Sequence, residues 1–167
     1  MYEVVGYLSA IIVAVSYFTT DKVFVVLQTV SNVLISLSFL MQGLYLSTLG
    51  TAIATIRTIT LGLSRDKRVL KISIFCILHA LVSLIGYDTM YDLIYLVGLE
   101  MFTLAFLVRD THTFRCTLIV PNLLYIVYKL CVGSIGSMIG TLIETIAIFI
   151  YIFRRKYERV RTIQIIR

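Results

Sequence analysis

The sequence predicts an all-α membrane protein of seven transmembrane helices, arranged as two parallel three-helix repeats joined by a linker helix. Three observations lead to this prediction. The 167 residues are 59% hydrophobic and only 14% charged, with a mean hydropathy of +0.97, whereas soluble domains are about 45–50% apolar and about 25% charged. The apolar runs are long and show no alternation of period two, which indicates helices rather than a barrel. The chain also repeats part of itself.

The repeated segment is Asn32–Arg57, which recurs without a gap as Asn122–Ala147. In such an apolar chain, matches between apolar residues are weak evidence for a repeat, whereas matches of Gly or Asn in one register are stronger evidence. The identical pairs include Asn32 with Asn122, Gly43 with Gly133, Ser47 with Ser137, and Gly50-Thr51 with Gly140-Thr141. We interpret this match as an internal duplication.

Charges, glycines and turn clusters divide the chain into seven apolar spans, several near the lower limit of roughly 17–25 residues that a bilayer requires. The predicted spans are about 3–20, 23–42, 46–63, 70–86, 91–108, 116–132 and 135–153. Repeat 1 then covers 1–64, the linker helix 69–87 and repeat 2 90–154, and a basic tail covers 155–167. Because three helices cross a membrane an odd number of times, the linker helix makes the two repeats parallel.

The basic residues predict the orientation. With the N-terminus outside, the cytoplasmic side receives Lys22, Arg65, Lys67, Arg68, Lys71, Arg109, Arg115 and the tail, and the outer side receives only Glu3, Asp88 and Asp92. This split follows the positive-inside rule, whereas the alternative of six spans would place basic loops on both sides. The net charge of +6 therefore indicates topology and anionic inner-leaflet lipids, which the tail could contact, rather than nucleic acid.

Three ionisable residues lie near the middle of predicted spans, where charges are costly and usually functional. Arg57 lies about eleven residues, or roughly 16 Å, below the outer end of its helix, and Glu100 and Glu144 lie at similar depth. The repeat alignment places Arg57 and Glu144 one turn apart on equivalent faces. Two interpretations stay open: a structural ion pair of Arg57 with Glu144 or Glu100, and a central site for a polar or zwitterionic solute.

Four uncharged polar residues complete the candidate site. Asn32 and Asn122 occupy equivalent positions in the two repeats, and Gln28 and Tyr125 lie one turn away on the same faces. These residues either bind the solute or form hydrogen bonds between helices. Lys129, near the outer end of its span, is expected to extend its amine to the interface.

The remaining polar features favour structural roles. We expect His79 to be a satisfied helix contact, and Cys76, Cys116 and Cys131 to be buried, inert thiols. Gly43, Gly50, Gly133, Gly136 and Gly140 are expected to bring span 2 close to span 3 and span 6 close to span 7. The sequence holds no motif of a hydrolase, a metal site or a nucleotide site, so no enzyme, cofactor or metal is expected.

The short spans in a 3+1+3 order, with Asn in the second helix and Gly before the third, resemble the SWEET and PQ-loop transporter superfamily. The chain more closely resembles YgjV-type bacterial inner-membrane proteins, through Gly6-Tyr7-Leu8, Asp21-Lys22, Gly43 and Arg57. The only proline is Pro121, no Pro-Gln pair occurs, and tryptophan is missing, so a sugar is not the expected solute.

The resemblance implies a multi-pass carrier of the bacterial inner membrane, with the N-terminus outside and the C-terminus cytoplasmic. Its solute would be small and polar, and it would cross by alternating access between the two three-helix bundles. A non-transporting receptor or assembly subunit on the same fold is the alternative, as is a small pore. Whether the protein forms a homo-oligomer is left open.

Overall fold

The computed structural model describes residues 1–64, 66–87 and 89–166, with side chains up to residue 154. The predicted loop residues Arg65 and Asp88, and Arg167 of the tail, lie outside the described residues. All regular secondary structure in the described ranges is helical. The helices are α1 (Tyr2–Ser16), α2 (Asp21–Met41), α3 (Tyr45–Leu63), α4 (Arg68–Gly86), α5 (Met90–Ala105), α6 (Thr111–Thr117), α7 (Ile119–Cys131) and α8 (Ile135–Ile166).

Helices α6 and α7 abut at Leu118, so the eight segments form seven helices. Five of these are long and apolar enough to cross a membrane within the described ranges: α2, α3, α4, the joined α6–α7 and the first part of α8. The other two are shorter, with 15 residues in α1 and 16 in α5. Each of these two ends in three successive i→i−3 hydrogen bonds, at residues 17–19 and 106–108, so tight turns replace the last helical turn of the predicted spans.

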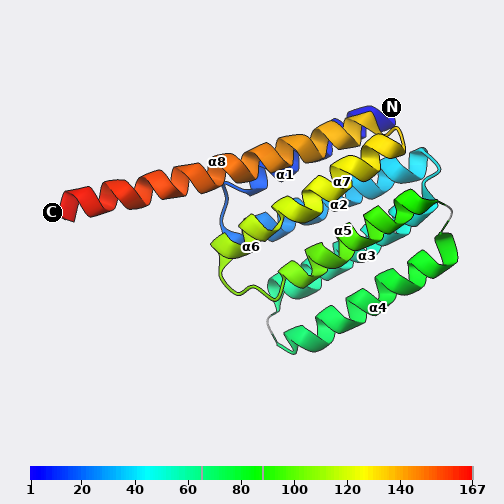
Figure 1. Ribbon diagram of the computed structural model, residues 1–167, viewed down its shortest axis with the longest axis horizontal. Helices are drawn as coiled ribbons and strands as arrows, with labels where there is room; N and C mark the ends of the chain where they lie inside the picture. The colour runs from blue at the N-terminus through cyan, green and yellow to red at the C-terminus, as the bar shows by residue number, and fades with distance from the viewer. Residues whose placement is uncertain (65, 88, 167) are drawn as a thin grey trace.

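Six helices form a ring, and the seventh lies outside it. Along the ring α1 packs on α2, α2 on α3, α3 on α5, α5 on α7, α7 on α8, and α8 on α1. Helix α4 packs against α3 and α5 from outside and forms an edge of the bundle (Figure 1). The ring has two halves, α1–α3 and α5–α8. The halves meet at two contacts, α3 with α5 and α8 with α1, and these contacts are equivalent when the two halves are superposed as repeats.

The two long hairpins of the ring have the same turn. Gly43 and Gly133 both adopt positive φ, +75° and +72°, which favours glycine because it has no Cβ. The hydrogen bonds that follow also match, from Leu44 N to Phe39 O (3.0 Å) and from Ser134 N to Lys129 O (2.9 Å). The duplicated sequence therefore forms duplicated local structure at the turn.

The other glycines pack differently from the prediction. A Cβ on Gly50 would lie 2.9 Å from Leu99 of α5, and one on Gly140 would lie 3.1 Å from Ala10 of α1. Gly136 likewise approaches α1. The prediction that these three glycines bring span 2 close to span 3 and span 6 close to span 7 is therefore wrong. Gly50 brings α3 close to α5, and Gly136 and Gly140 bring α8 close to α1, so these glycines join the two halves of the ring.

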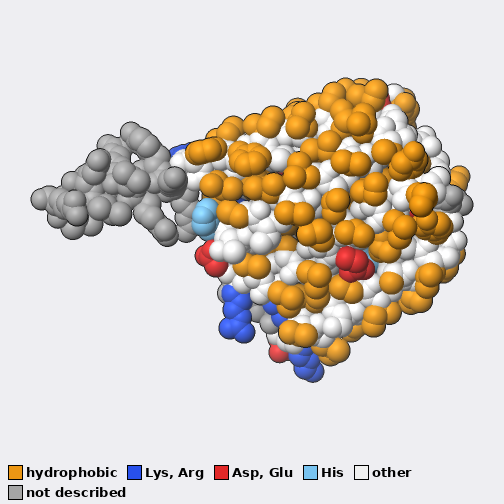
Figure 2. Space-filling view, viewed as in Figure 1, with side chains coloured by type: hydrophobic (Ala, Val, Ile, Leu, Met, Phe, Trp, Pro, Cys, Tyr) orange, Lys and Arg blue, Asp and Glu red, His pale blue; other side chains and the backbone are white. Residues whose placement is uncertain are grey.

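The two ends of the bundle differ in charge. The connections α1–α2, α3–α4 and α5–α6 lie at the end from which α8 projects, and the N-terminus lies at the opposite end (Figure 1). We call the former the basic end, because Lys22, Lys67, Arg68, Lys71, Arg109 and Arg115 all lie there. Figure 2 shows basic side chains near this end and mostly hydrophobic side chains over the rest of the visible face, with an acidic side chain near its middle. Apolar residues such as Ile85, 87% exposed, and Leu130, 62% exposed, suit contact with lipid.

Candidate functional site

A cavity of about 60 Å³ lies within the ring, lined by residues from all six of its helices. At about 10–15 Å³ for each water, it has room for about four to six water molecules. Six of the seven predicted site residues line it: Gln28, Asn32, Arg57, Asn122, Tyr125 and Glu144. The folded chain thus brings together residues that lie more than a hundred positions apart in sequence.

Arg57 reaches the cavity from α3 and is only 2% exposed. Its NH1 donates to Thr103 Oγ1 (2.7 Å) and to the carbonyl of Leu99 (3.3 Å), both on α5. The guanidinium carbon also lies 4.7 Å from the ring centre of Phe102, within the range of a cation–π contact. Arg57 therefore joins the two halves of the ring at the α3–α5 contact.

Glu144 has the corresponding position at the other contact between the halves. It lies on α8 and is 8% exposed, and Tyr17 at the end of α1 donates its hydroxyl to Oε1 at 2.7 Å. The ion pair, one of the two interpretations left open by the sequence, does not form: in the described part of the chain, neither Glu144 nor Glu100 lies within 4.0 Å of a charged nitrogen of Arg57. Arg57 and Glu144 are instead held separately, each by a hydroxyl of the opposite half.

Lys129 corrects another prediction. It is 4% exposed and lines the cavity, with Nζ donating to Thr141 Oγ1 (2.6 Å) and to the carbonyl of Ser137 (3.1 Å). Nζ also lies 5.8 Å from the ring centre of Phe39, its counterpart in the other repeat. The interpretation that Lys129 extends to the interface is wrong, because α8 offers it acceptors inside the ring. The cavity therefore contains two cationic side chains and one carboxylate.

The two asparagines differ in their contacts although their positions are equivalent. Asn32 is partly buried, and its Nδ2 lies 3.5 Å from Thr58 Oγ1, at the limit of a hydrogen bond. Asn122 is 1% exposed, and its Nδ2 has no hydrogen-bond partner among the described protein atoms. Amide groups of this kind, next to open volume, are available to a bound molecule.

Gln28 and Tyr125 complete the predicted set. Gln28 is 3% exposed and donates from Nε2 to Ser16 Oγ at 3.3 Å. Tyr125 is partly buried, and its ring packs against Gly98 of α5. Both face the cavity, as their place one turn from the asparagines predicted.

Glu100 does not line this cavity. It lies on the side of α5 that faces α4, with Oε1 3.9 Å from Nδ1 of His79. Equal depth in the membrane predicted a shared site, but depth does not determine the direction in which a helix presents a side chain. His79 is 1% exposed and neither ring nitrogen has a hydrogen-bond partner in the described structure, so it is not the satisfied contact that we expected.

The cysteines also differ from the prediction in part. Cys76 and Cys116 are partly buried, whereas Cys131 at the end of α7 is exposed. We inferred that Cys131 is buried because it lies in an apolar run, but its side chain is exposed at the end of α7.

Four aromatic side chains close the ring between the cavity and the basic end. Tyr17 packs edge to face on Phe24 (5.5 Å between ring centres), Phe24 on Phe114 (6.1 Å), and Phe114 lies 5.0 Å from Phe106. Phe24 and Phe114 occupy equivalent positions in the two repeats. In each case the backbone N–H donates to the carbonyl of the residue just before the helix. Extending the ungapped repeat alignment would have paired Phe24 with Phe114, but it pairs Tyr17 with Leu107 and so finds only half of this aromatic quartet.

Arg115 holds the quartet in place. It is 4% exposed, and its guanidinium donates to the carbonyls of Tyr17 (2.6 Å) and Thr19 (3.2 Å) and lies 4.9 Å from the ring centre of Phe24. Its NH2 is also 3.6 Å from Asp21 Oδ1. The sequence placed Arg115 in a basic loop, and its buried role depends on contacts nearly a hundred residues away.

A tyrosine cluster lies toward the other end. Tyr95 is 4.9 Å from Tyr128 between ring centres. The Tyr95 hydroxyl donates to the carbonyl of Ser47 (2.9 Å) and lies 2.8 Å from Thr51 Oγ1, and the Tyr128 hydroxyl lies 2.5 Å from Ser47 Oγ. The cavity therefore lies between two aromatic clusters, one on each side along the ring axis.

Comparison with known proteins identifies the family. A family model described as Imp-YgjV, bacterial inner membrane protein, matches residues 1–159. The chain belongs to the Imp-YgjV family. No curated protein and no solved structure matches it significantly. Membership in the Imp-YgjV family and the five long apolar helices agree with a multi-pass protein of the bacterial inner membrane.

Proposed function

We propose that this Imp-YgjV protein is a carrier for a small zwitterionic solute, which binds in the cavity of the six-helix ring. The observation that carries the proposal is the unpaired arrangement of charge: Arg57 and Lys129 line the same cavity as Glu144, and no ion pair joins them in the described structure. A zwitterion supplies both missing partners, since its carboxylate suits Arg57 and Lys129 and its ammonium suits Glu144.

Burial of these charges supports binding over a purely structural role. Charged groups inside a membrane protein are costly unless they are paired or act on a solute. Here Arg57, Lys129 and Glu144 have neutral hydroxyl and carbonyl partners, which lower the cost of burial without neutralising the charge. The small cavity also limits the solute, because about 60 Å³ admits only a few non-hydrogen atoms before the ring must open.

The arrangement of the ring supports alternating access. In this proposal α1–α3 and α5–α8 are two parallel bundles in a SWEET-like 3+1+3 order, and α4 links them. The aromatic quartet closes the basic end and the tyrosine cluster closes the other, so rocking of the two halves would open one cluster at a time. All seven helices then span the membrane, with the N-terminus outside and the basic end in the cytoplasm.

A ligand screen on the purified protein tests binding. Glycine, alanine and glycine betaine are compared with glycerol, an uncharged control, by the shift in melting temperature. At a hundredfold excess over Kd, a bound solute stabilises the folded state by about 2.7 kcal/mol. We expect a zwitterion to stabilise the parent and not Glu144→Gln, whereas Glu3→Gln, the same change at the start of α1, retains the shift. Stabilisation by glycerol alone, or an undiminished shift in Glu144→Gln, contradicts the zwitterion site.

Labelling then separates a carrier from a receptor. Single cysteines at Ile35 and Gln28 lie in the cavity wall of α2, with Ile35 nearer the outer end. In a carrier, Ile35→Cys reacts with impermeant thiol reagents from outside and Gln28→Cys from inside, and solute shifts the balance. If both react from one side only under every condition, the receptor is the better interpretation.

A further inference from the structure

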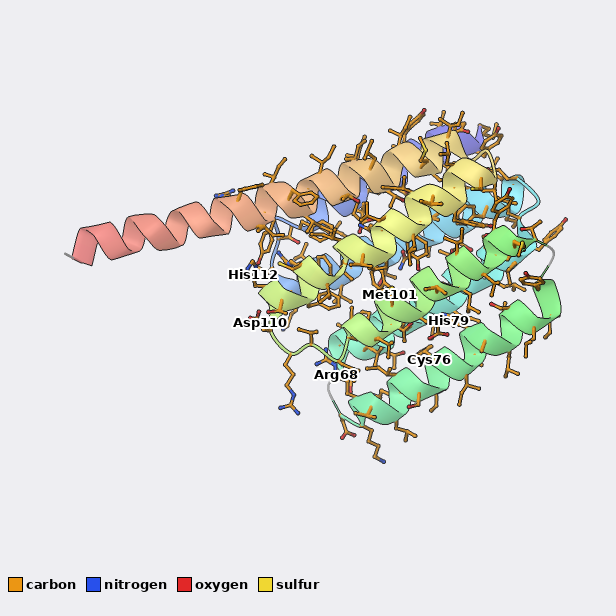
Figure 3. The ribbon with its side chains drawn as sticks, viewed as in Figure 1. Arg68, Cys76, His79, Met101, Asp110 and His112 are labelled. Carbon is orange, nitrogen blue, oxygen red and sulfur yellow. The ribbon has the colours of Figure 1, made fainter. Side chains whose placement is uncertain are left out.

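A second group of titratable side chains lies between α4 and α5, outside the ring cavity. His79 of α4 is 1% exposed, and its Nδ1 lies 3.9 Å from Oε1 of Glu100. The Glu100 side chain is 25% exposed. Figure 3 shows His79 and Cys76 on the side of α4 that faces α5.

Three polar atoms of this pair lack hydrogen-bond partners in the described structure, although the Cys76 thiol contacts the Glu100 carboxyl group. Nδ1 and Nε2 of His79 and Oε1 of Glu100 are buried and have no hydrogen-bond partner among the described protein atoms. Buried polar atoms are nearly always hydrogen-bonded, so three exceptions within one residue pair need an explanation. A proton on Oε1 of Glu100 or on Nδ1 of His79 would make that atom a donor that faces the other atom as its acceptor, and carboxylate and histidine groups inside membrane helices commonly bind protons.

The neighbouring helices define the electrostatic surroundings of the pair. Arg57 of α3 acts on both Glu100 and His79, Cys76 of α4 faces Glu100, and Tyr125 of α7 also interacts with Glu100. Arg57 contacts α5 through the carbonyl of Leu99, the residue before Glu100. A change of charge on Glu100 therefore changes the electrostatic interaction with Arg57, a cation that lines the ring cavity.

We propose that Glu100 and His79 together form a proton-binding site at the α4–α5 interface. With one proton bound, either on Glu100 or on His79, the pair has no net charge. Release of the proton leaves one negative charge on Glu100 and a neutral imidazole, and the proton passes to water without another reactant. The negative charge attracts Arg57 and so changes the charge balance at the cavity wall. This deepens the proposed function by naming the proton as the coupling ion, and only that coupling rests on the carrier proposal.

Infrared difference spectroscopy tests the site itself. The full-length protein in lipid nanodiscs is titrated with acid and base, and the carboxyl band of a buried protonated side chain is followed. We expect the parent to show this band, Glu100→Gln to lose it and Glu144→Gln to keep it. His79→Asn removes one of the two groups that hold the proton, so the midpoint of the band moves to lower pH, whereas His112→Asn leaves the midpoint unchanged.

Nitrogen NMR of labelled histidine follows His79 directly, without a substitution of His79. The sequence has two histidines, so His112→Asn leaves His79 as the only signal. We expect its ring nitrogens to respond over the same pH range as the infrared band and to stop responding there when Glu100→Gln is added. A band that survives Glu100→Gln, or a His79 signal indifferent to Glu100, overturns the proton site.

Uptake into proteoliposomes then tests the coupling separately. A pH gradient is expected to drive solute accumulation in the parent and not in Glu100→Gln, which still binds solute in the melting assay. If the band and the His79 signal behave as expected but no solute is taken up, the proton site stands and the carrier fails. If the spectra behave as expected but solute uptake is the same with and without a pH gradient, only the proposed coupling is contradicted.

Discussion

Arg57 and Glu144 face one cavity from the two equivalent contacts between the halves of the ring, and each is bound to the opposite half through a hydroxyl. Thr103 accepts from Arg57 at 2.7 Å, and Tyr17 donates to Glu144 at 2.7 Å. Because neither charge is neutralised, both remain available to a solute. The same bonds hold the halves together, so in the proposed carrier both solute binding and the closure of the ring would depend on these four side chains.

The first prediction concerns the Arg57 contact. Thr103→Val removes the hydroxyl that accepts from Arg57, and hydrogen bonds to charged groups contribute about 1.5–3 kcal/mol. We expect a loss of that size in the free energy of unfolding, measured by denaturation in detergent.

Thr60→Val is the matched control, because Thr60 is partly exposed and its hydroxyl donates to Ile56 O at 2.8 Å, as the Thr103 hydroxyl donates to Leu99 O at 2.7 Å. That change is expected to stay within about 0.5 kcal/mol. In an Arg57→Met background, Thr103→Val should cost clearly less than in the parent. An equal cost in both backgrounds would show that Arg57 does not account for the effect.

The second prediction concerns Tyr17. Tyr17→Phe keeps the ring in the aromatic quartet and removes the hydroxyl that donates to Glu144, so we expect a loss of about 1.5–3 kcal/mol in the free energy of unfolding. Tyr7→Phe, an exposed position on the same helix, serves as the control. Glu144→Gln keeps an acceptor for the Tyr17 hydroxyl and should be less destabilising than Tyr17→Phe while abolishing solute binding. A Tyr17→Phe protein as stable as the parent would refute the role of this bond at the α1–α8 contact.

The third prediction concerns topology. In a protein with Cys76, Cys116 and Cys131 changed to Ser, single cysteines at Thr89 and Lys67 lie at opposite ends of the bundle. Impermeant reagents added to intact cells should label Thr89→Cys, and those added to inverted vesicles should label Lys67→Cys. Labelling of both from one side would exclude the seven-span topology with the N-terminus outside.

The fourth prediction tests the position of Lys129. Its amine lies inside the ring, bound to Ser137 and Thr141, so an impermeant amine reagent should leave it unmodified while the tyrosine cluster is closed. Lys22 at the basic end is exposed and should react in inverted vesicles. Tyr95→Ala opens the cluster and is expected to expose Lys129 to reagent from the outer side, as detected by mass spectrometry. Rapid modification of Lys129 in the parent would restore its expected position at the interface.

The sequence alone determined the helical class, the bounds of most helices and the duplication. These features follow from local patterns: apolar length, charged breaks and glycines at turns, such as Gly43 and Gly133. It also indicated six of the residues that line the cavity, because polar groups in apolar helices are rare and the repeat alignment placed them on equivalent faces.

Only the tertiary structure decided the partner of each polar side chain. Depth along a helix predicted that Glu100 would join Arg57 and that Lys129 would extend outward, but the direction of a side chain depends on which helix lies opposite. Helix α4 offers His79 to Glu100, and α8 offers Ser137 and Thr141 to Lys129. Arg115 and the aromatic quartet likewise acquire their roles from contacts across the ring, which no local pattern specifies. Hydrogen bonds and packing are properties of neighbouring surfaces in space, and those neighbours are fixed only when the ring closes.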